Sequence, residues 1–273
     1  MNRQRATSLA EQLSERDHAL LLDLERFRLL STKHLQRLRF TDHASELAAA
    51  RASARALLRL EALGVVTALD RRIGGVRKGS ASYIWQLTAT GERYLRASRG
   101  EARRRRFLEP GAVFVNHTLA VNDVAVGLLE ADRRHAGFTV EQLQTEPHNW
   151  RRYLGPAGEV KWLKPDLHVI SVVGGQDGYE EHAFLEIDLG TEHLPRIQAK
   201  CRIYAAYART GAYQAHYGLF PAVVWLSPDP ARRAALSAAV AATTGLDGLP
   251  GGVFRVAGPE DYLRAATGVT SPN

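Results

Sequence analysis

Hydrophobic and polar positions alternate with a helical period through the first part of the chain. Within residues 17–30, four apolar side chains fall on one side of a segment that is otherwise mostly charged or polar: Leu20, Leu21, Leu24 and Phe27. This spacing is typical of an amphipathic helix. Extended along the chain, the pattern predicts helices over 17–30, 33–40, 45–64 and 90–97, and strands over 65–72 and 80–88.

From residue 112 onward, helical and strand patterns are mixed. They predict helices over 115–135, 195–208 and 230–242, and strands over 138–147, 165–173, 182–189, 221–227 and 252–258. Three consecutive strands followed by a crossover helix imply a mixed sheet flanked by helices. The apolar run at 182–189 indicates a central strand. The predicted fold class is therefore α+β or α/β.

Composition agrees with a folded protein and argues against a membrane-spanning, a secreted or a cysteine-stabilised protein. The chain has 273 residues, of which 45% are hydrophobic. It has no apolar run near the ~20 residues that span a bilayer, and its N-terminal segment lacks the apolar core of a signal peptide. The single cysteine, Cys201, excludes an internal disulfide and a cysteine-rich zinc site. We therefore expect a cytoplasmic protein without membrane contact.

Charge is distributed unevenly between the two halves of the chain. Residues 1–110 carry a net charge of +10, whereas residues 111–273 carry −3. Clustered positive charge favours binding to a polyanion such as DNA. The front half is thus the predicted DNA-binding part, and the back half is expected to have a different function.

The order of three helices and a strand hairpin in the front half resembles a winged helix-turn-helix domain. In that fold the third helix enters the major groove of duplex DNA and the hairpin contacts the backbone nearby. Arg51, Arg55 and Arg59 share one face of the predicted third helix. The hairpin adds four cations: Arg71, Arg72, Arg77 and Lys78. These side chains are the predicted phosphate contacts, with a solvated face or a protein-binding winged helix as alternatives.

The winged helix is predicted to occupy residues 1–97. Residues 98–111 follow as a basic linker, in which Arg103–Arg106 is an unbroken run of cations. This run is either a solvated connector or a contact to the DNA backbone. The second domain is predicted over 112–260, with a tail over 261–273.

Two predicted strands carry carboxylates where apolar residues are expected. Asp166 stands at the head of one strand, and Glu186 and Asp188 share one face of the next. Burial of a carboxylate is costly unless a cation or a metal compensates it. Oxygen ligands on neighbouring strands can hold Mg²⁺ or Mn²⁺, and such an ion promotes phosphodiester hydrolysis. Alternatively, the acids cap a turn, pair with arginines, or remain from a degenerate site.

Pro165-Asp166 followed by Glu186-Ile187-Asp188 resembles the PD-(D/E)xK signature of restriction-endonuclease-like nucleases. The resemblance implies that Asp166, Glu186 and Asp188 are catalytic and hold the metal, together with the Ile187 carbonyl. The chain departs from the signature at Asp188, where the family has a lysine. Some members take this lysine from the following helix, where Lys200 is one of only five lysines in the chain. Lys200 is therefore the candidate for positioning the attacking water.

Other interpretations of nearby polar residues are structural. Glu192, Arg196 and Lys200 are spaced to form a ladder of ion pairs along one helix face. His117 lies on an apolar stripe, which favours a place in the core. The same holds for Tyr204, although a tyrosine nucleophile within its cluster is an alternative: Tyr204, Tyr207, Tyr213 and Tyr217.

Several short motifs follow one another across nearly the whole chain. Their residues are His117, Asn122, Asp123, Asp166, Glu186, Asp188, Gly190, Thr191, Glu192, Lys200 and Tyr204. These motifs follow the predicted winged helix, and their combined order resembles the replication-relaxation family of plasmid and mobile-element proteins. The resemblance implies a DNA partner and, as our hypothesis, metal-dependent nicking or cleavage of DNA. The alternative is a non-catalytic DNA-binding initiator or regulator. Duplex DNA is the predicted partner, while a homodimer and other replication or mobilisation proteins stay open.

Overall fold

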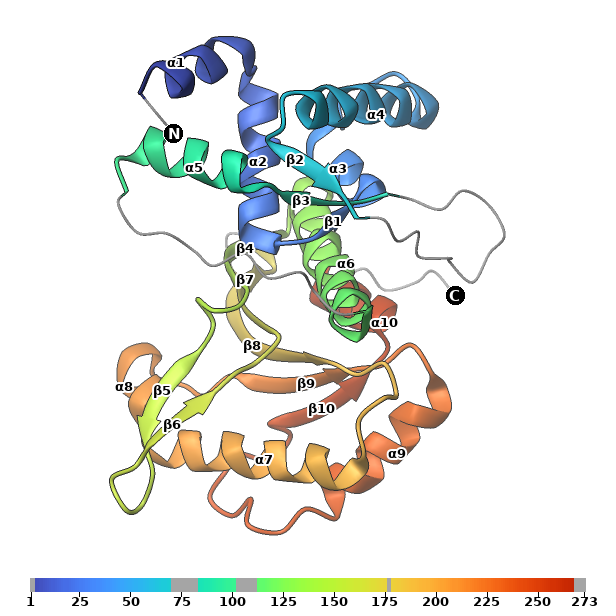
Figure 1. Cartoon of the computed structure of the whole chain (residues 1–273). Helices are drawn as coiled ribbons and strands as arrows, with labels where there is room; N and C mark the ends of the chain where they lie inside the picture. Colours follow the sequence, from blue (N-terminus) through green and yellow to red (C-terminus); the bar gives the residue numbers. More distant parts are fainter. Residues whose placement is uncertain (1–2, 70–82, 102–111, 176–177, 268–273) are drawn as a thin grey trace. The chain divides into compact units, whose positions relative to one another are not determined.

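The computed structural model describes four ranges of the chain: 3–69, 83–101, 112–175 and 178–267. Their contacts divide the chain into two compact units, Met1–Val126 and Gly127–Asn273. The division falls inside helix α6 (Ala112–Arg134). The structure is mixed α+β, as predicted, and the second unit contains a five-stranded mixed sheet flanked by helices (Figure 1).

The first unit combines helices with one small sheet. Its elements before α6 are α1 (Arg3–Gln12), α2 (Glu15–Phe27), β1 (Leu30–Ser31), α3 (Thr32–Arg39), α4 (Glu46–Ala62), β2 (Val66–Ala68), β3 (Ile84–Leu87) and α5 (Ala89–Arg99). The three strands are antiparallel, in the order β1-β3-β2. The sequence pattern predicts neither α1 nor β1. A strand of two residues is too short to show an alternation.

Serine side chains fix where the helices of this unit begin. Ser14, Ser31 and Ser45 each accept a hydrogen bond from the backbone N–H three residues further on, at the starts of α2, α3 and α4. After α4, Gly64 adopts a φ of 70°, a conformation that glycine tolerates best and that ends a helix. The predicted apolar face of α2 is at most 2% exposed: Leu20, Leu21, Leu24 and Phe27.

Two motif residues on the first half of α6 hold the first unit together. The buried Asn122 amide donates to the backbone carbonyls of Phe27, at 3.1 Å, and Leu29, at 2.6 Å. The Asp123 Oδ1 atom lies 2.8 Å from His34 Nε2. Both contacts tie α6 to the segment around β1, which explains these residues without any role in chemistry.

The second unit is built around a sheet with strand order β10-β9-β8-β7-β4. After α6 its elements are β4 (Phe138–Gln144), β5 (Arg151–Leu154), β6 (Val160–Leu163), β7 (Leu167–Val173), β8 (Tyr179–Ile187), α7 (Leu194–Arg209), α8 (Ala212–Tyr217), β9 (Ala222–Leu226), α9 (Pro230–Ala241), β10 (Phe254–Ala257) and α10 (Pro259–Thr267). Strands β4, β7 and β8 are antiparallel, whereas β8, β9 and β10 are parallel. The strand predicted to be central, β8, is central.

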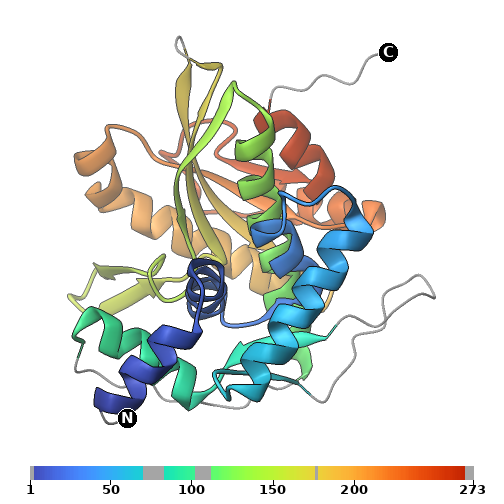
Figure 2. The same cartoon turned by 90° about the horizontal axis from the view of Figure 1, so that it is seen from above.

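Helices cover both faces of this sheet. Helices α7 and α9 lie on one face, and α10 and the end of α6 lie on the other (Figures 1 and 2). The hairpin of β5 and β6 forms a separate two-stranded sheet. The sequence pattern misses this hairpin, and also α8 and α10, because each is short and largely exposed. Within the described ranges, no helix combines the length and the apolar character needed to cross a bilayer.

Candidate functional site

Asp166 and Glu186 lie side by side at one end of the central strands. Leu167, the first residue of β7, pairs with Leu185 on β8, so Asp166, which precedes the strand, stands across from Glu186. The Ile187 N–H donates to Asp166 Oδ2 at 2.7 Å, which holds the aspartate against β8. The two predicted carboxylates are therefore brought together by the sheet register itself.

Glu186 is only 1% exposed, and each of its carboxylate oxygens accepts a hydrogen bond from α7. Lys200 Nζ donates to Oε2 and the Tyr204 hydroxyl donates to Oε1. Lys200 and Tyr204 are four residues apart, so they project from the same side of the helix. The structure thus places Lys200 beside Glu186 rather than in the ion-pair ladder, which is reduced to Arg196 and Glu192 at 3.4 Å.

Burial controls protonation in this cluster. It raises the pKa of the Glu186 carboxyl to about 8, against the opposing effect of the Lys200 charge and with the added effect of the Asp166 charge. Burial alone would lower the pKa of Lys200, but the charges of Glu186 and Asp166 outweigh it and raise that pKa. Burial also raises the pKa of Tyr204. The ammonium and the phenol therefore keep their protons near neutral pH, and Glu186 is the group that titrates.

Asp188 shares the face of Glu186 on β8, but its carboxylate is already engaged. Arg232, in the first turn of α9, donates from Nε to Oδ1 and from Nη2 to Oδ2, both at 2.8 Å. The Gly190 N–H donates to Oδ1 at 2.7 Å. Asp188 is 4% exposed, so this bidentate pair provides the charge compensation that a buried carboxylate needs.

The donor set at this end of the sheet suits a hard divalent cation with few protein ligands. Among the described residues, no group of three or more histidine, cysteine, aspartate and glutamate side chains could hold a metal ion. Mg²⁺ is commonly held by one or two carboxylates, with water and phosphate oxygens completing the shell. Asp166 and Glu186 are two such carboxylates, and in this structure the Glu186 oxygens accept from Lys200 and Tyr204. A Mg²⁺ or Mn²⁺ ion at this place would have to be held by these two residues, because Asp188 pairs with Arg232.

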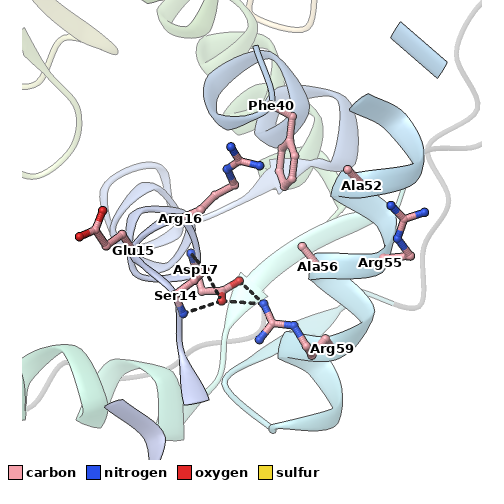
Figure 3. A pocket seen from close by; sticks show the side chains of 9 residues that line it. All are labelled: Ser14, Glu15, Arg16, Asp17, Phe40, Ala52, Arg55, Ala56 and Arg59. Atoms are coloured by element: carbon pink, nitrogen blue, oxygen red, sulfur yellow. Dashed lines mark hydrogen bonds and ion pairs between the residues drawn. The ribbon is translucent and has the colours of Figure 1, made fainter. Parts of the chain in front are cut away.

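The predicted DNA-binding arginines of α4 divide into two kinds. Arg51 and Arg55 are exposed, and neither pairs with a carboxylate in the part of the chain that the structure describes. Arg59 instead places Nη2 at 2.6 Å from both oxygens of Asp17, which is 1% exposed and caps α2. Figure 3 shows this pair in a pocket of about 670 Å³ between α2, α3 and α4, with Arg55 pointing away from it.

The remaining predicted cations of the front half lie outside the described residues. They are Arg71, Arg72, Arg77 and Lys78 of the predicted hairpin, and Arg103–Arg106 of the predicted linker. Their assignment as phosphate contacts stays a prediction.

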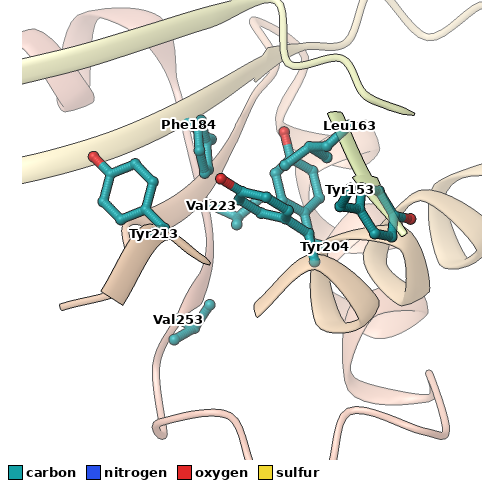
Figure 4. Close-up of a cluster of buried hydrophobic side chains, with 8 residues drawn as sticks. Tyr153, Leu163, Phe184, Tyr204, Tyr213, Val223 and Val253 are labelled. Atoms are coloured by element: carbon teal, nitrogen blue, oxygen red, sulfur yellow. The ribbon is translucent and has the colours of Figure 1, made fainter. Parts of the chain in front are cut away.

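The tyrosines of α7 and α8 belong mainly to the core. Tyr204, Tyr207 and Tyr213 are buried against Phe184 and the β5–β6 hairpin (Figure 4), whereas Tyr217 is 36% exposed. The Tyr213 hydroxyl lies 2.8 Å from His168 Nε2 and 2.8 Å from His182 Nδ1. Burial lowers the pKa of His168 to about 3, so its imidazole is neutral and can serve in this hydrogen-bond chain.

Two residues of the site escape prediction from the sequence. Arg232 carries no local signal, because nothing in its helix marks it as the partner of an aspartate 44 residues earlier. Tyr204 is predicted in the core and is buried there, but its hydroxyl also donates a hydrogen bond to Glu186. The four-residue spacing from Lys200 is the signal that could have found it.

Fold and site together define a two-unit α+β protein with a buried cluster of two carboxylates, a lysine and a tyrosine at one end of a mixed sheet. The family model described as replication-relaxation matches residues 21–223. The chain therefore belongs to the replication-relaxation family, as its motif order predicts, and this membership suggests a role in plasmid or mobile-element replication or relaxation. Comparisons with curated proteins and with solved structures found no match.

Proposed function

We propose that this protein binds duplex DNA through its first unit and nicks one DNA strand at the Asp166–Glu186–Lys200 cluster of its second unit. The observation that carries the proposal is the convergence of these three side chains, from the residue before β7, from β8 and from α7. Two acids and a lysine at the end of central strands support a restriction-endonuclease-like interpretation of the second unit. The helix and strand order of the first unit supports a winged helix.

Each residue of the cluster has a defined part in the proposed reaction. Asp166 and Glu186 would hold Mg²⁺ or Mn²⁺, which supplies charge stabilisation at the phosphate and a more acidic water. Lys200 keeps its proton and orients the attacking water or the phosphate oxygens through its N–H groups. Tyr204 restrains the Glu186 side chain, while the Arg232–Asp188 pair fixes the end of β8 against α9.

The test is incubation of the protein with supercoiled plasmid in Mg²⁺, in Mn²⁺ or in EDTA. We expect conversion to open circles with either metal and none in EDTA, because the carboxylates alone cannot neutralise charge on the phosphate. Accumulation of open circles before linear DNA distinguishes a nick from a double-strand cut. Conversion that persists in EDTA would reject the metal-dependent mechanism.

One observation favours a second candidate, a DNA-binding initiator or regulator without catalysis. Both oxygens of Glu186 are already occupied by Lys200 and Tyr204, so the cluster is satisfied without a metal. In this alternative the buried pair stabilises the fold only. The plasmid would then be bound, but it would stay supercoiled in every metal tested.

DNA binding by α4 makes a separate prediction about two neighbouring arginines. Replacing Arg51 and Arg55 together with alanine should weaken duplex binding and reduce the slope of log K against log salt by about 2, since each lost phosphate contact contributes roughly 0.9. The measurement is fluorescence anisotropy with labelled duplex over a salt series. An unchanged slope would remove α4 from the proposed interface.

Arg59→Ala is the matched control on the same helix face, and it should behave differently. It removes the partner of the buried Asp17 and should cost about 2 kcal/mol of stability, as expected for a lost hydrogen bond to a charged group. The shift is measured by thermal unfolding. Duplex affinity below the unfolding temperature should remain close to that of the unmodified chain.

A further inference from the structure

One face of the β5–β6 hairpin is apolar, basic and exposed. The register pairs Arg152 with Trp162 and Leu154 with Val160, so these four side chains share one face of the two-stranded sheet. All four are exposed, with 58% for Leu154, 48% for Val160 and 47% for Trp162. The opposite face buries Tyr153 and Leu163 in the core cluster of Figure 4. The hairpin is therefore anchored to the core through the face opposite the exposed one.

An aromatic and cationic arrangement surrounds Trp162. Its ring meets the ring of Trp150 edge to face, with 6.3 Å between the centroids. Lys164 Nζ lies 4.0 Å from the centroid of Trp150, a cation–π contact that keeps the ammonium beside the two rings. Arg152 stands directly across from Trp162. A planar ligand with negative charges along its length would find both a ring to stack on and cations to pair with.

The charge of this segment contrasts with that of its surroundings. Residues 150–164 contain four cations and one acid, a net charge of +3, whereas residues 111–273 as a whole carry −3. The one acid, Glu159, pairs with Lys161 at 2.8 Å. Arg152 and Lys164 thus remain as cations beside an exposed tryptophan, which favours a polyanion with aromatic groups over a protein partner.

We propose that this hairpin face, defined by Arg152, Leu154, Val160, Trp162 and Lys164, binds single-stranded DNA. Unpaired bases stack on Trp162, and the backbone phosphates pair with Arg152 and Lys164. Bases in a duplex are stacked on one another and cannot use this ring, so the face selects melted DNA. Lys164 precedes Asp166 by two residues, so the bound strand is close to the carboxylate cluster. The inference rests on the proposed function in that it names single-stranded DNA as the substrate form.

The experiment measures binding of the full chain to labelled oligo(dT) and to a labelled duplex hairpin, in EDTA so that no cutting occurs. Trp162→Ala should lower the affinity for oligo(dT) by about tenfold, the loss expected for one stacked base, and leave the duplex affinity unchanged. Trp162→Phe should restore most of the affinity, because its ring also stacks. Tyr179→Ala is the control. Tyr179 is also an exposed aromatic residue, at 65%, but it lies at the first residue of β8, at the end opposite Glu186.

A second readout comes from the tryptophan itself. Trp85 and Trp225 are each 2% exposed, so quenching by oligo(dT) should come from Trp162 and the adjacent Trp150. The quenching should decrease in Trp162→Ala, which leaves Trp150 alone. Equal oligo(dT) affinity for the unmodified chain and Trp162→Ala would overturn the proposal. So would a change in self-association without a change in DNA affinity, which would make the face a contact between copies of the chain.

Failure of this inference and failure of the proposed function can be told apart. If the protein nicks DNA in a metal-dependent way but Trp162→Ala does not change its oligo(dT) affinity, single-stranded DNA binding by the hairpin face is rejected. The nuclease proposal is then unaffected. Trp162-dependent binding of oligo(dT) without nicking in any metal would support the hairpin and reject the nuclease proposal.

Discussion

Glu186→Gln should reduce metal-dependent nicking of supercoiled plasmid by about 1,000-fold, and Asp166→Asn should do the same. Loss of one carboxylate ligand removes several kcal/mol of charge stabilisation at the phosphate, and about 4 kcal/mol corresponds to three powers of ten in rate. The substitutions keep the size and shape of each side chain. The glutamine carbonyl oxygen can still accept from Lys200, with the Tyr204 hydroxyl turned to accept from the glutamine NH2 group, and the asparagine oxygen can still accept from the Ile187 N–H. Initial rates of open-circle formation in Mn²⁺ measure the effect.

Asp188→Asn is the matched control for this experiment. It alters another buried acid, two residues further along the chain and 4% exposed against 1% for Glu186, whose carboxylate pairs with Arg232 instead of Lys200. We expect lower thermal stability with a nicking rate within about threefold of the unmodified protein, a change of less than 1 kcal/mol in the barrier. A loss at Asp188 as large as that at Glu186 would restore Asp188 to the metal site and contradict the two-ligand assignment.

The elements that form the cluster could be predicted because each has a strong local signal. The apolar run of β8 marks a central strand even though it contains Glu186, and consecutive antiparallel strands bring Asp166 beside it. Pro195, at the start of α7, fixes the helix that carries Lys200. Spacing within these elements was therefore enough to bring together the three residues of the proposed site.

The ion pairs formed by Asp188 and Asp17 could not be predicted, because they join distant parts of the chain. Arg232 is 44 residues from Asp188, and Arg59 is 42 residues from Asp17. In a chain where arginine is the dominant cation, no local pattern distinguishes an arginine that pairs internally from one that faces solvent. The same limit applies to the β5–β6 hairpin, because the only residues it buries are one from each strand, Tyr153 and Leu163.

Lys200→Met should destabilise the protein by an amount that grows with pH, from about 1 kcal/mol at pH 6 to about 3 kcal/mol at pH 9. Burial already raises the pKa of Glu186 to about 8 with Lys200 present, and removal of the ammonium raises it further. A carboxyl whose pKa is higher in the folded state than in the unfolded state binds more protons when folded. Its contribution to stability is therefore lost as pH rises.

The loss of stability in Lys200→Met should differ between pH 6 and pH 9. At pH 6 Glu186 is mostly protonated with or without Lys200, so little beyond one hydrogen bond is lost. At pH 9 the unmodified chain holds an ion pair, whereas the variant must keep its carboxyl protonated at a cost of about 1.4 kcal/mol per pH unit. Urea denaturation curves at both values measure the difference.

Two controls test whether the pH dependence belongs to the buried pair. Lys200→Met combined with Glu186→Gln removes the titrating group, so its loss of stability should be the same at pH 6 and pH 9. Lys161→Met breaks a pair with Glu159 in which both side chains are more than 40% exposed, and it should leave the stability unchanged at either pH, because solvent screens such a pair. If Lys200→Met alone were insensitive to pH, Glu186 would not be the titrating group. Its oxygens would then already be ionised at neutral pH, and a metal would have no proton to displace from them.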